Sequence, residues 1–164
     1  MTGEKIVILG IGNLLRGDDG VGVHTVRALG KMALPPGIEL VDGGTSPELF
    51  EYLDTAEKLV VIDAMDTSDR PGSIYRFRLD DLKNEPKGMA SAHDIGLMSL
   101  INLSRLTGRR IPETVFIGIQ PASLGWGIEL SPSIEAKIPI IVRLVMQEIR
   151  ADLPNEVSIA VEAS

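Results

Sequence analysis

The sequence predicts a three-layer α/β/α sandwich, built on a mostly parallel five-stranded sheet with one antiparallel edge strand. Three observations lead to this fold class. Short apolar runs have the length of buried strands, helical stretches separate them, and one further segment alternates apolar residues with arginines. We therefore expect one domain over residues 1–164, with its strands in the spatial order 2-1-3-5-4.

Strands that are buried on both faces of a parallel sheet are continuously apolar. Three segments have that pattern: Ile6–Leu9, Leu59–Ile62 and Val115–Ile119. Gly37–Val41 contains one charged residue, so we predict a less buried strand there. Within Ser73–Leu79, Arg76 and Arg78 fall on one face, which is typical of a half-exposed edge strand.

Four helices are expected between and after these strands: Gly20–Leu34, Pro47–Ala56, Ser91–Thr107 and Pro132–Ala151. The second and the fourth each begin with a serine before a proline, a pair that favours a helix start. The last helix carries isoleucine and valine at three- and four-residue spacing, which predicts a stripe facing the core. Pro139 is expected to kink this helix near Ile138.

Composition narrows the classes of function. The chain has 16 basic and 23 acidic residues, a net charge of -7 and no cysteine. The acidic balance argues against nucleic acid as a partner, and the lack of cysteine excludes disulfides and thiolate chemistry. No apolar run approaches the roughly 18 residues of a membrane span, and the N-terminus lacks a signal-peptide pattern. We expect a cytoplasmic protein without a membrane partner.

A glycine-rich turn, Gly10–Gly20, follows the first strand. A dinucleotide-binding turn needs a third glycine where Leu15 stands, and a phosphate-binding P-loop needs a lysine where Asp18 stands. Two adjacent carboxylates at a helix start would also repel a phosphate. The turn is therefore better suited to a cation or to capping. We predict that Asp18 caps the following helix, which leaves Asp19 to point elsewhere.

Two more polar residues are predicted at the same edge of the sheet. Asp63 follows the strand Leu59–Ile62, and His93 begins the helix predicted from Ser91. Ligands of open α/β sheets bind outside the carboxyl ends of the strands, where a crossover helix also begins. Two carboxylates and an imidazole suit a divalent cation such as nickel or zinc. The alternative is a set of caps and surface acids that do not meet.

His24, the other histidine, lies within the first predicted helix, beside valines. No potential partner for it stands nearby in the sequence. It is expected on the surface or at the edge of the core.

An ordered set of motifs covers nearly the whole chain and resembles that of the [NiFe]-hydrogenase maturation endopeptidases. The motifs are Gly10–Asn13 with Gly17–Gly22, Asp42–Thr45, Asp63–Ala64, Pro71–Gly72, Ser91–His93, and Gly118–Pro121 with Leu130–Pro132. Each motif alone is unspecific, and their order is what carries the resemblance. One departure is Ala122, which stands where some members of the family carry a glutamate.

The resemblance implies an endopeptidase that removes a C-terminal extension from a [NiFe]-hydrogenase large-subunit precursor after nickel insertion. Asp19, Asp63 and His93 would then be the catalytic and metal-contacting residues. The nickel is expected to be that of the precursor, with another divalent cation able to occupy the site in the isolated protein.

A second set of residues is expected to bind the substrate: Asp42, Gly43, Gly44 and Thr45. From the residues alone, this segment could instead be only a turn. Two other functions also remain open. One is a module that binds or chaperones the metal centre without cleavage, and the other is a nucleotide-binding α/β protein.

Overall fold

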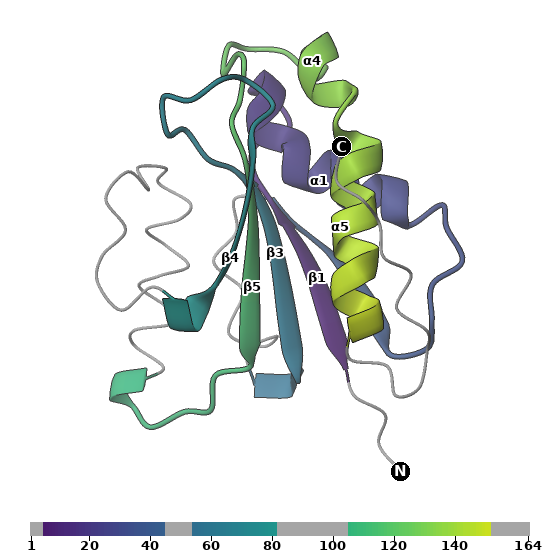
Figure 1. Cartoon of the computed structure of the whole chain (residues 1–164), viewed down its shortest axis with the longest axis vertical. Helices are drawn as coiled ribbons and strands as arrows, with labels where there is room; N and C mark the ends of the chain where they lie inside the picture. The colour runs from purple at the N-terminus through teal and green to yellow at the C-terminus, as the bar shows by residue number, and fades with distance from the viewer. Residues whose placement is uncertain (1–4, 45–53, 82–104, 152–164) are drawn as a thin grey trace.

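The computed structural model describes residues 5–44, 54–81 and 105–151 (Figure 1). Its centre is a five-stranded sheet with the strand order β2-β1-β3-β5-β4. Four strands run parallel: β1 (Ile6–Ile11), β2 (Ile38–Gly44), β3 (Lys58–Ala64) and β5 (Glu113–Ile119). The edge strand β4 (Ile74–Arg78) pairs antiparallel with β5. The predicted α/β class, with a mostly parallel five-stranded sheet and one antiparallel edge strand, and the predicted strand order are confirmed.

The two longest helices described in the structure cover one face of this sheet. Figure 1 shows α1 (Val21–Leu29) and α5 (Ile138–Ala151) on the same side. The shorter helical elements are η1 (Gly17–Gly20), η2 (Leu79–Asp81) and α4 (Pro132–Glu135). Most of the helices predicted over 47–56 and 91–107 falls outside the described residues, so the helical layer on the opposite face stays a prediction.

The apolar runs in the sequence arise because both faces of the sheet are covered. In β1 and β3, Ile8 and Val60 belong to the core beneath α1 and α5, whereas Leu9 and Val61 belong to a second core on the opposite face. All four side chains are 1% exposed or less. Alternate residues therefore enter different cores, and neither set can be polar.

Two helix predictions need correction. The first helix ends at Leu29, before its predicted end at Leu34. The last helix is split into α4 and α5, and Pro139 is the second residue of α5. A proline is tolerated in the first turn of a helix because its missing N–H has no partner there. Pro139 therefore lies just after a helix start. In place of the predicted kink, the chain has a break between two separate helices.

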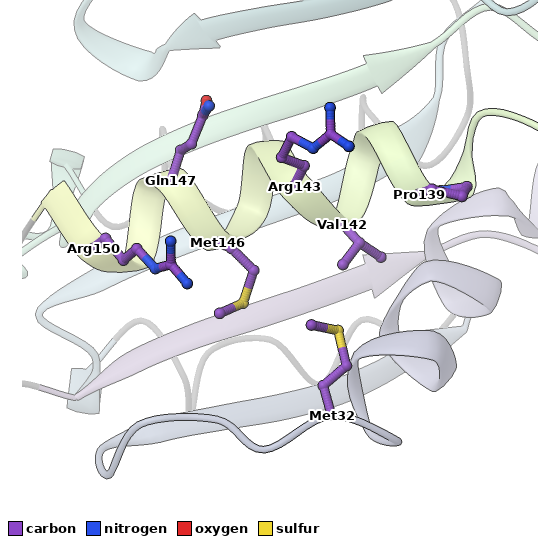
Figure 2. Close-up of a pocket in the computed structure, with 7 residues that line it drawn as sticks. All are labelled: Met32, Pro139, Val142, Arg143, Met146, Gln147 and Arg150. Atoms are coloured by element: carbon purple, nitrogen blue, oxygen red, sulfur yellow. The ribbon is translucent and has the colours of Figure 1, made fainter. Parts of the chain in front are cut away.

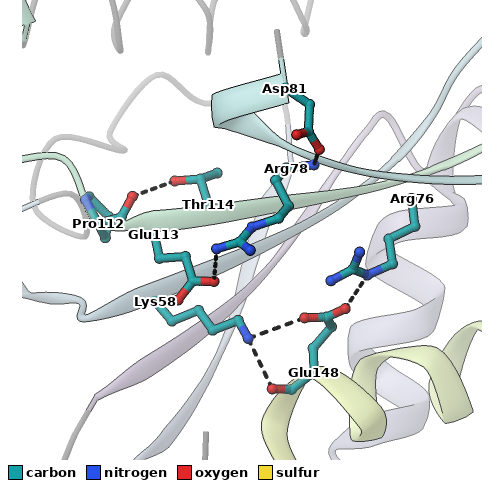
Figure 3. A network of polar contacts seen from close by, with 8 residues as sticks. All are labelled: Lys58, Arg76, Arg78, Asp81, Pro112, Glu113, Thr114 and Glu148. Carbon is teal, nitrogen blue, oxygen red and sulfur yellow. Dashed lines mark hydrogen bonds and ion pairs between the residues drawn. The ribbon is translucent and has the colours of Figure 1, made fainter. Parts of the chain in front are cut away.

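A buried ion-pair network holds α5 against the sheet (Figure 3). The Nζ atom of Lys58 lies 3.1 Å from both the carboxylate and the backbone carbonyl of Glu148, and Arg76 donates to the other carboxylate oxygen. Lys58 and Glu148 are only 3% and 6% exposed. Burial alone would raise the pKa of Glu148, but the hydrogen bonds from Arg76 and Lys58 outweigh it and lower this pKa.

Replacing Glu148 by glutamine should destabilise the fold by about 3–5 kcal/mol, because Lys58 would stay buried without a carboxylate. Chemical denaturation of the parent and of Glu148→Gln measures this loss. Because the pKa of Glu148 is lowered in the folded state, its contribution is present above its ordinary value of 4.5 and is lost as the pH falls through the folded value.

The matched control is Glu113→Gln, which removes an exposed carboxylate 2.7 Å from Arg78. This pair should contribute less than about 1 kcal/mol. Equal losses in the two variants would contradict the assignment of the buried network as the anchor of α5.

Candidate functional site

The three acids of the predicted site lie where parallel strands end. Asp63 is the next-to-last residue of β3, and Asp42 belongs to the last three residues of β2. Asp19 lies in η1, which follows β1 and packs against β3. His93 and Thr45 lie outside the described residues. The structure therefore places Asp19 and Asp63 on neighbouring elements, and the third predicted metal contact stays a prediction.

The turn that carries Asp19 and the start of α1 lie very close to the sheet because Gly12 and Gly22 have no side chain. Gly12 has a φ of +137°, and a Cβ atom there would lie 1.8 Å from the Asp19 carbonyl oxygen. A Cβ atom on Gly22 would lie 2.1 Å from the carbonyl oxygen of Ile62 in β3. Larger residues would force η1 and the start of α1 away from β1 and β3. The glycine motif therefore sets the position of Asp19 relative to the end of β3.

The carboxylate of Asp19 is partly buried and oriented by its own turn. Its Oδ2 atom accepts a hydrogen bond of 2.8 Å from the backbone N–H of Asn13. Asn13 in turn accepts a hydrogen bond from the N–H of Leu15 through its side-chain oxygen. The conformation of the turn thus fixes the direction of this acid.

Asp63 is buried, with 5% of its surface exposed. It alternates with Val61 and Met65, and these three residues line a small cavity together with Phe77 and Phe116. Ligands of open α/β sheets bind outside the carboxyl ends of the strands, so the position of this buried acid suits a functional site. The acid faces the side of the sheet opposite α1.

Asp42 differs from Asp63 because it faces α1. Its Oδ2 atom lies 3.9 Å from Arg27 of α1, and both side chains are exposed. Its Oδ1 atom accepts a hydrogen bond from the N–H of Gly44. Asp42 is thus at the expected edge of the sheet, with its side chain on the other face from Asp63.

The prediction that Asp18 caps the first helix is wrong. Its side chain is fully buried and crosses to the loop after β5. There it accepts hydrogen bonds of 2.7–2.9 Å from three backbone N–H groups and from the Ser131 hydroxyl. A turn of 3-10 helix precedes α1, so Asp18 lies one turn too early for the capping position. The hydroxyl of Ser131, predicted as a helix cap, is likewise used by Asp18.

Asp18→Asn should lower the stability by about 2–3 kcal/mol. An asparagine side chain presents an NH₂ group in place of one acceptor oxygen, and every partner of Asp18 here is a donor. Thermal and chemical denaturation measure the loss.

Asp81→Asn serves as the control for Asp18→Asn, since Asp81 is exposed and accepts one hydrogen bond, from the Arg78 N–H. It should change the stability by less than about 1 kcal/mol. An Asp18→Asn protein as stable as this control would show that the hydrogen bonds of Asp18 contribute little to the stability.

Gln120 orders the segment that follows Asp63. Its side chain is 5% exposed, and its Oε1 atom accepts hydrogen bonds from the N–H groups of Thr67 at 2.7 Å and Asp69 at 3.3 Å. Its Nε2 atom donates to Asp66, and this bond lowers the pKa of the Asp66 carboxyl. The sequence marked Gln120 only as part of a motif, because its partners are more than 50 residues away.

His24 lies at the edge of the core, as predicted. It is half-buried on α1, and its Nε2 atom has no hydrogen-bond partner within the described part of the chain. Burial lowers its pKa below the ordinary value of 6.5, and the positive charge of Arg27 lowers it further. His24 is therefore neutral at pH 7.

The lowered pKa of His24 predicts a loss of stability in mild acid. The unfolded chain takes up the proton more readily, so stability is complete above about pH 6.5 and falls as the pH drops towards the folded value. Melting temperatures of the parent and of His24→Gln from pH 5 to pH 8 test this. As the pH falls, the melting temperature of His24→Gln should rise relative to that of the parent. A difference in melting temperature that does not change with pH would contradict the expectation.

A separate pocket of about 350 Å³ lies between Met32 and α5 (Figure 2). Methionine, valine and arginine side chains such as Met146 and Arg143 surround it. None of the residues that line it carries a carboxylate or an imidazole. It is therefore unrelated to the acids at the carboxyl edge of the sheet, and within the described ranges no group of three or more His, Asp or Glu side chains could hold a metal ion.

Comparison with known proteins gives a consistent result. The sequence profile described as hydrogenase maturation protease matches residues 23–148. The chain belongs to the hydrogenase maturation protease family. The hydrogenase 2 maturation protease of Escherichia coli is 31% identical and is aligned over 89% of this chain and 91% of its own. The hydrogenase expression/formation protein HupD of Rhodobacter capsulatus is 35% identical, over 90% of this chain and 72% of its own.

Solved structures agree with the family assignment. The hydrogenase maturating endopeptidase HybD from E. coli superposes with a TM-score of 0.80 at 30% identity, covering 90% of this chain and 93% of that one. HybD from Thermococcus kodakarensis gives a TM-score of 0.71 at 29% identity, covering 88% and 98%. This member of the family is therefore a peptidase with the same α/β fold. The helices among residues 5–44, 54–81 and 105–151 are all too short or too polar to cross a bilayer.

Proposed function

We propose that this protease removes the C-terminal extension of a [NiFe]-hydrogenase large-subunit precursor, and that nickel already inserted in the precursor is its recognition signal. The supporting observation is the placement of Asp19 and Asp63 on neighbouring elements at one edge of the sheet, in a chain of the hydrogenase maturation protease family. The precursor and its nickel together are the substrate.

Asp19, Asp63 and His93 would complete the coordination of the precursor's nickel. Carboxylate oxygens and an imidazole nitrogen are suitable ligands for a divalent cation of this kind. Contact with the ion would hold the scissile peptide bond in register, which is a proximity effect. A water molecule, activated by the metal or by a carboxylate, would add to the carbonyl carbon. The C–N bond then breaks, leaving a carboxylate on the large subunit and an amine on the released extension.

The end of β2 would grip the substrate beside this centre. Asp42, Gly43 and Gly44 lie next to the last residues of β1, since Gly10 pairs with Asp42 and Ile11 with Gly44. The Asp42 side chain is exposed and can accept further hydrogen bonds. Together with Thr45, these residues are proposed to hold the extended chain near the scissile bond.

Incubation with nickel-loaded and with nickel-free precursor tests the proposal. The parent should cleave only the loaded form. Asp63→Asn keeps the size of the side chain but removes its charge, so processing should fall by about 100-fold or more. Gel electrophoresis of the reaction and mass spectrometry of the released peptide measure the effect.

Two matched controls separate catalysis from folding. Asp54→Asn changes an exposed acid that precedes the start of β3, at the other end of this strand from Asp63. This variant should process the precursor normally. His93→Ala should be inactive, whereas His24→Gln, measured at pH 8, should stay active. Thermal unfolding of each preparation identifies misfolded variants. Active and folded Asp63→Asn and His93→Ala proteins would rule out the proposed centre, and a parent that binds the precursor without cleavage would be a binding module.

A further inference from the structure

Three large apolar side chains are exposed close to the acidic edge of the sheet. Leu15, Trp126 and Ile128 are 57%, 81% and 67% exposed, and we call them the apolar rim. Trp126 is the only tryptophan of the chain. Scattered apolar residues are normal on a protein surface, but a cluster of large ones often marks an interaction site.

The two segments that carry the rim are hydrogen-bonded to each other. The N–H of Gly127 donates to the Leu15 carbonyl at 2.9 Å, and the N–H of Gly17 donates to the Gly127 carbonyl at 2.8 Å. Trp126 and Ile128 flank Gly127, so their side chains and that of Leu15 project from adjacent backbone. The rim is thus one surface built from two distant parts of the sequence.

Arg16 contacts the loop that carries the rim and stabilises it. Its Nε and Nη2 atoms donate to the Leu124 carbonyl at 3.1 and 3.0 Å. Its guanidinium carbon lies 5.3 Å from the centre of the Trp126 ring, in cation–π geometry. Asp18 fixes the same loop through the N–H groups of Ala122 and Ser123. These contacts hold the apolar side chains outward on a fixed backbone, which reduces the entropy lost when a partner binds.

The rim is continuous with the proposed centre. Leu15 and Arg16 belong to the same turn as Asp19, and Asp18 binds the loop that carries Trp126. A specific protein interface covers about 800 Å² on each partner. A folded protein that brings its metal to Asp19 would therefore also cover the rim.

We propose that the apolar rim is the docking surface for the folded body of the precursor. This inference rests on the proposed function. The matching surface of the precursor would be apolar, with a carboxylate placed to meet the guanidinium of Arg16. Tryptophan and arginine are the residue types that most often dominate the energy of an interface. A second copy of this chain is a poorer fit, because it would block the edge that the substrate must reach.

Steady-state cleavage of the nickel-loaded precursor provides the first test. Trp126→Ser and Ile128→Ser should raise KM by about tenfold or more and leave kcat within about twofold, because the rim does not touch the reacting bond. Both changes keep the backbone hydrogen bonds that hold the loop. The control is Leu106→Ser, which removes a side chain that is 85% exposed in the segment before the start of β5, and it should change neither constant.

Fluorine NMR gives a direct second test. Incorporation of 5-fluorotryptophan labels one position, so the spectrum should contain one resonance. Unlabelled, nickel-loaded precursor with a proline after its scissile bond, which blocks cleavage, should shift that resonance as the indole becomes buried. Leu106→Ser should show the same shift.

The outcomes separate the docking surface from the activity. If the parent cleaves the precursor while the rim variants keep its KM and the resonance does not move, the docking proposal fails and the proposed function stands. If the proline-blocked precursor moves the resonance but the parent does not cleave the unmodified nickel-loaded precursor, the docking surface is supported and the proposed function fails. The resonance could also shift when the concentration of the protein alone is raised, and Trp126→Ser could abolish a dimer in sedimentation. In that case a second copy of this chain covers the apolar rim, and the proposal is overturned.

Discussion

The close contact between the start of α1 and the centre of the sheet is the constraint on which the site depends. It exists because Gly12 and Gly22 leave no Cβ atom between the turn, β1 and β3. A helix that rested on ordinary side chains would lie farther from the sheet, and the acid of the turn would move with it. Gly10 and Gly12 make the turn resemble a dinucleotide-binding loop, although Leu15 stands where the third glycine of that motif would be. The close contact brings a carboxylate, that of Asp19, to the strand ends.

The loop after β5 is the second structural support of the site. Its residues form the partners of Asp18 on one side, and Gln120 binds the segment after Asp63 on the other. The segments that carry Asp19 and Asp63 are thus both hydrogen-bonded to this loop, although neither acid belongs to it. Because the side chains of Asp18 and Gln120 are themselves buried, a change in the loop is expected to affect the position of both acids.

The sequence predicted the features that depend on regular patterns. Continuous apolar runs indicated buried parallel strands, and the alternation with Arg76 and Arg78 indicated the edge strand. The role of Asp18 was not predictable, because its partners are over 100 residues away and local spacing favoured a cap. The break before α5 was not predictable for a related reason, since a proline marks an irregularity without deciding between a kink and a new helix. The convergence of His93 with the acids still rests on topology and on the family motifs.

The edge position of β4 has a consequence for the behaviour of the protein at high concentration. Within the part of the chain described, one side of β4 has no neighbouring strand. Such an edge can pair with another molecule and begin aggregation, and charged side chains oppose that pairing. Arg76 and Arg78 supply this protection while each also pairs with an acid of its own chain. The arginines that secure α5 and the start of β5 are therefore also expected to oppose edge-to-edge pairing of two molecules.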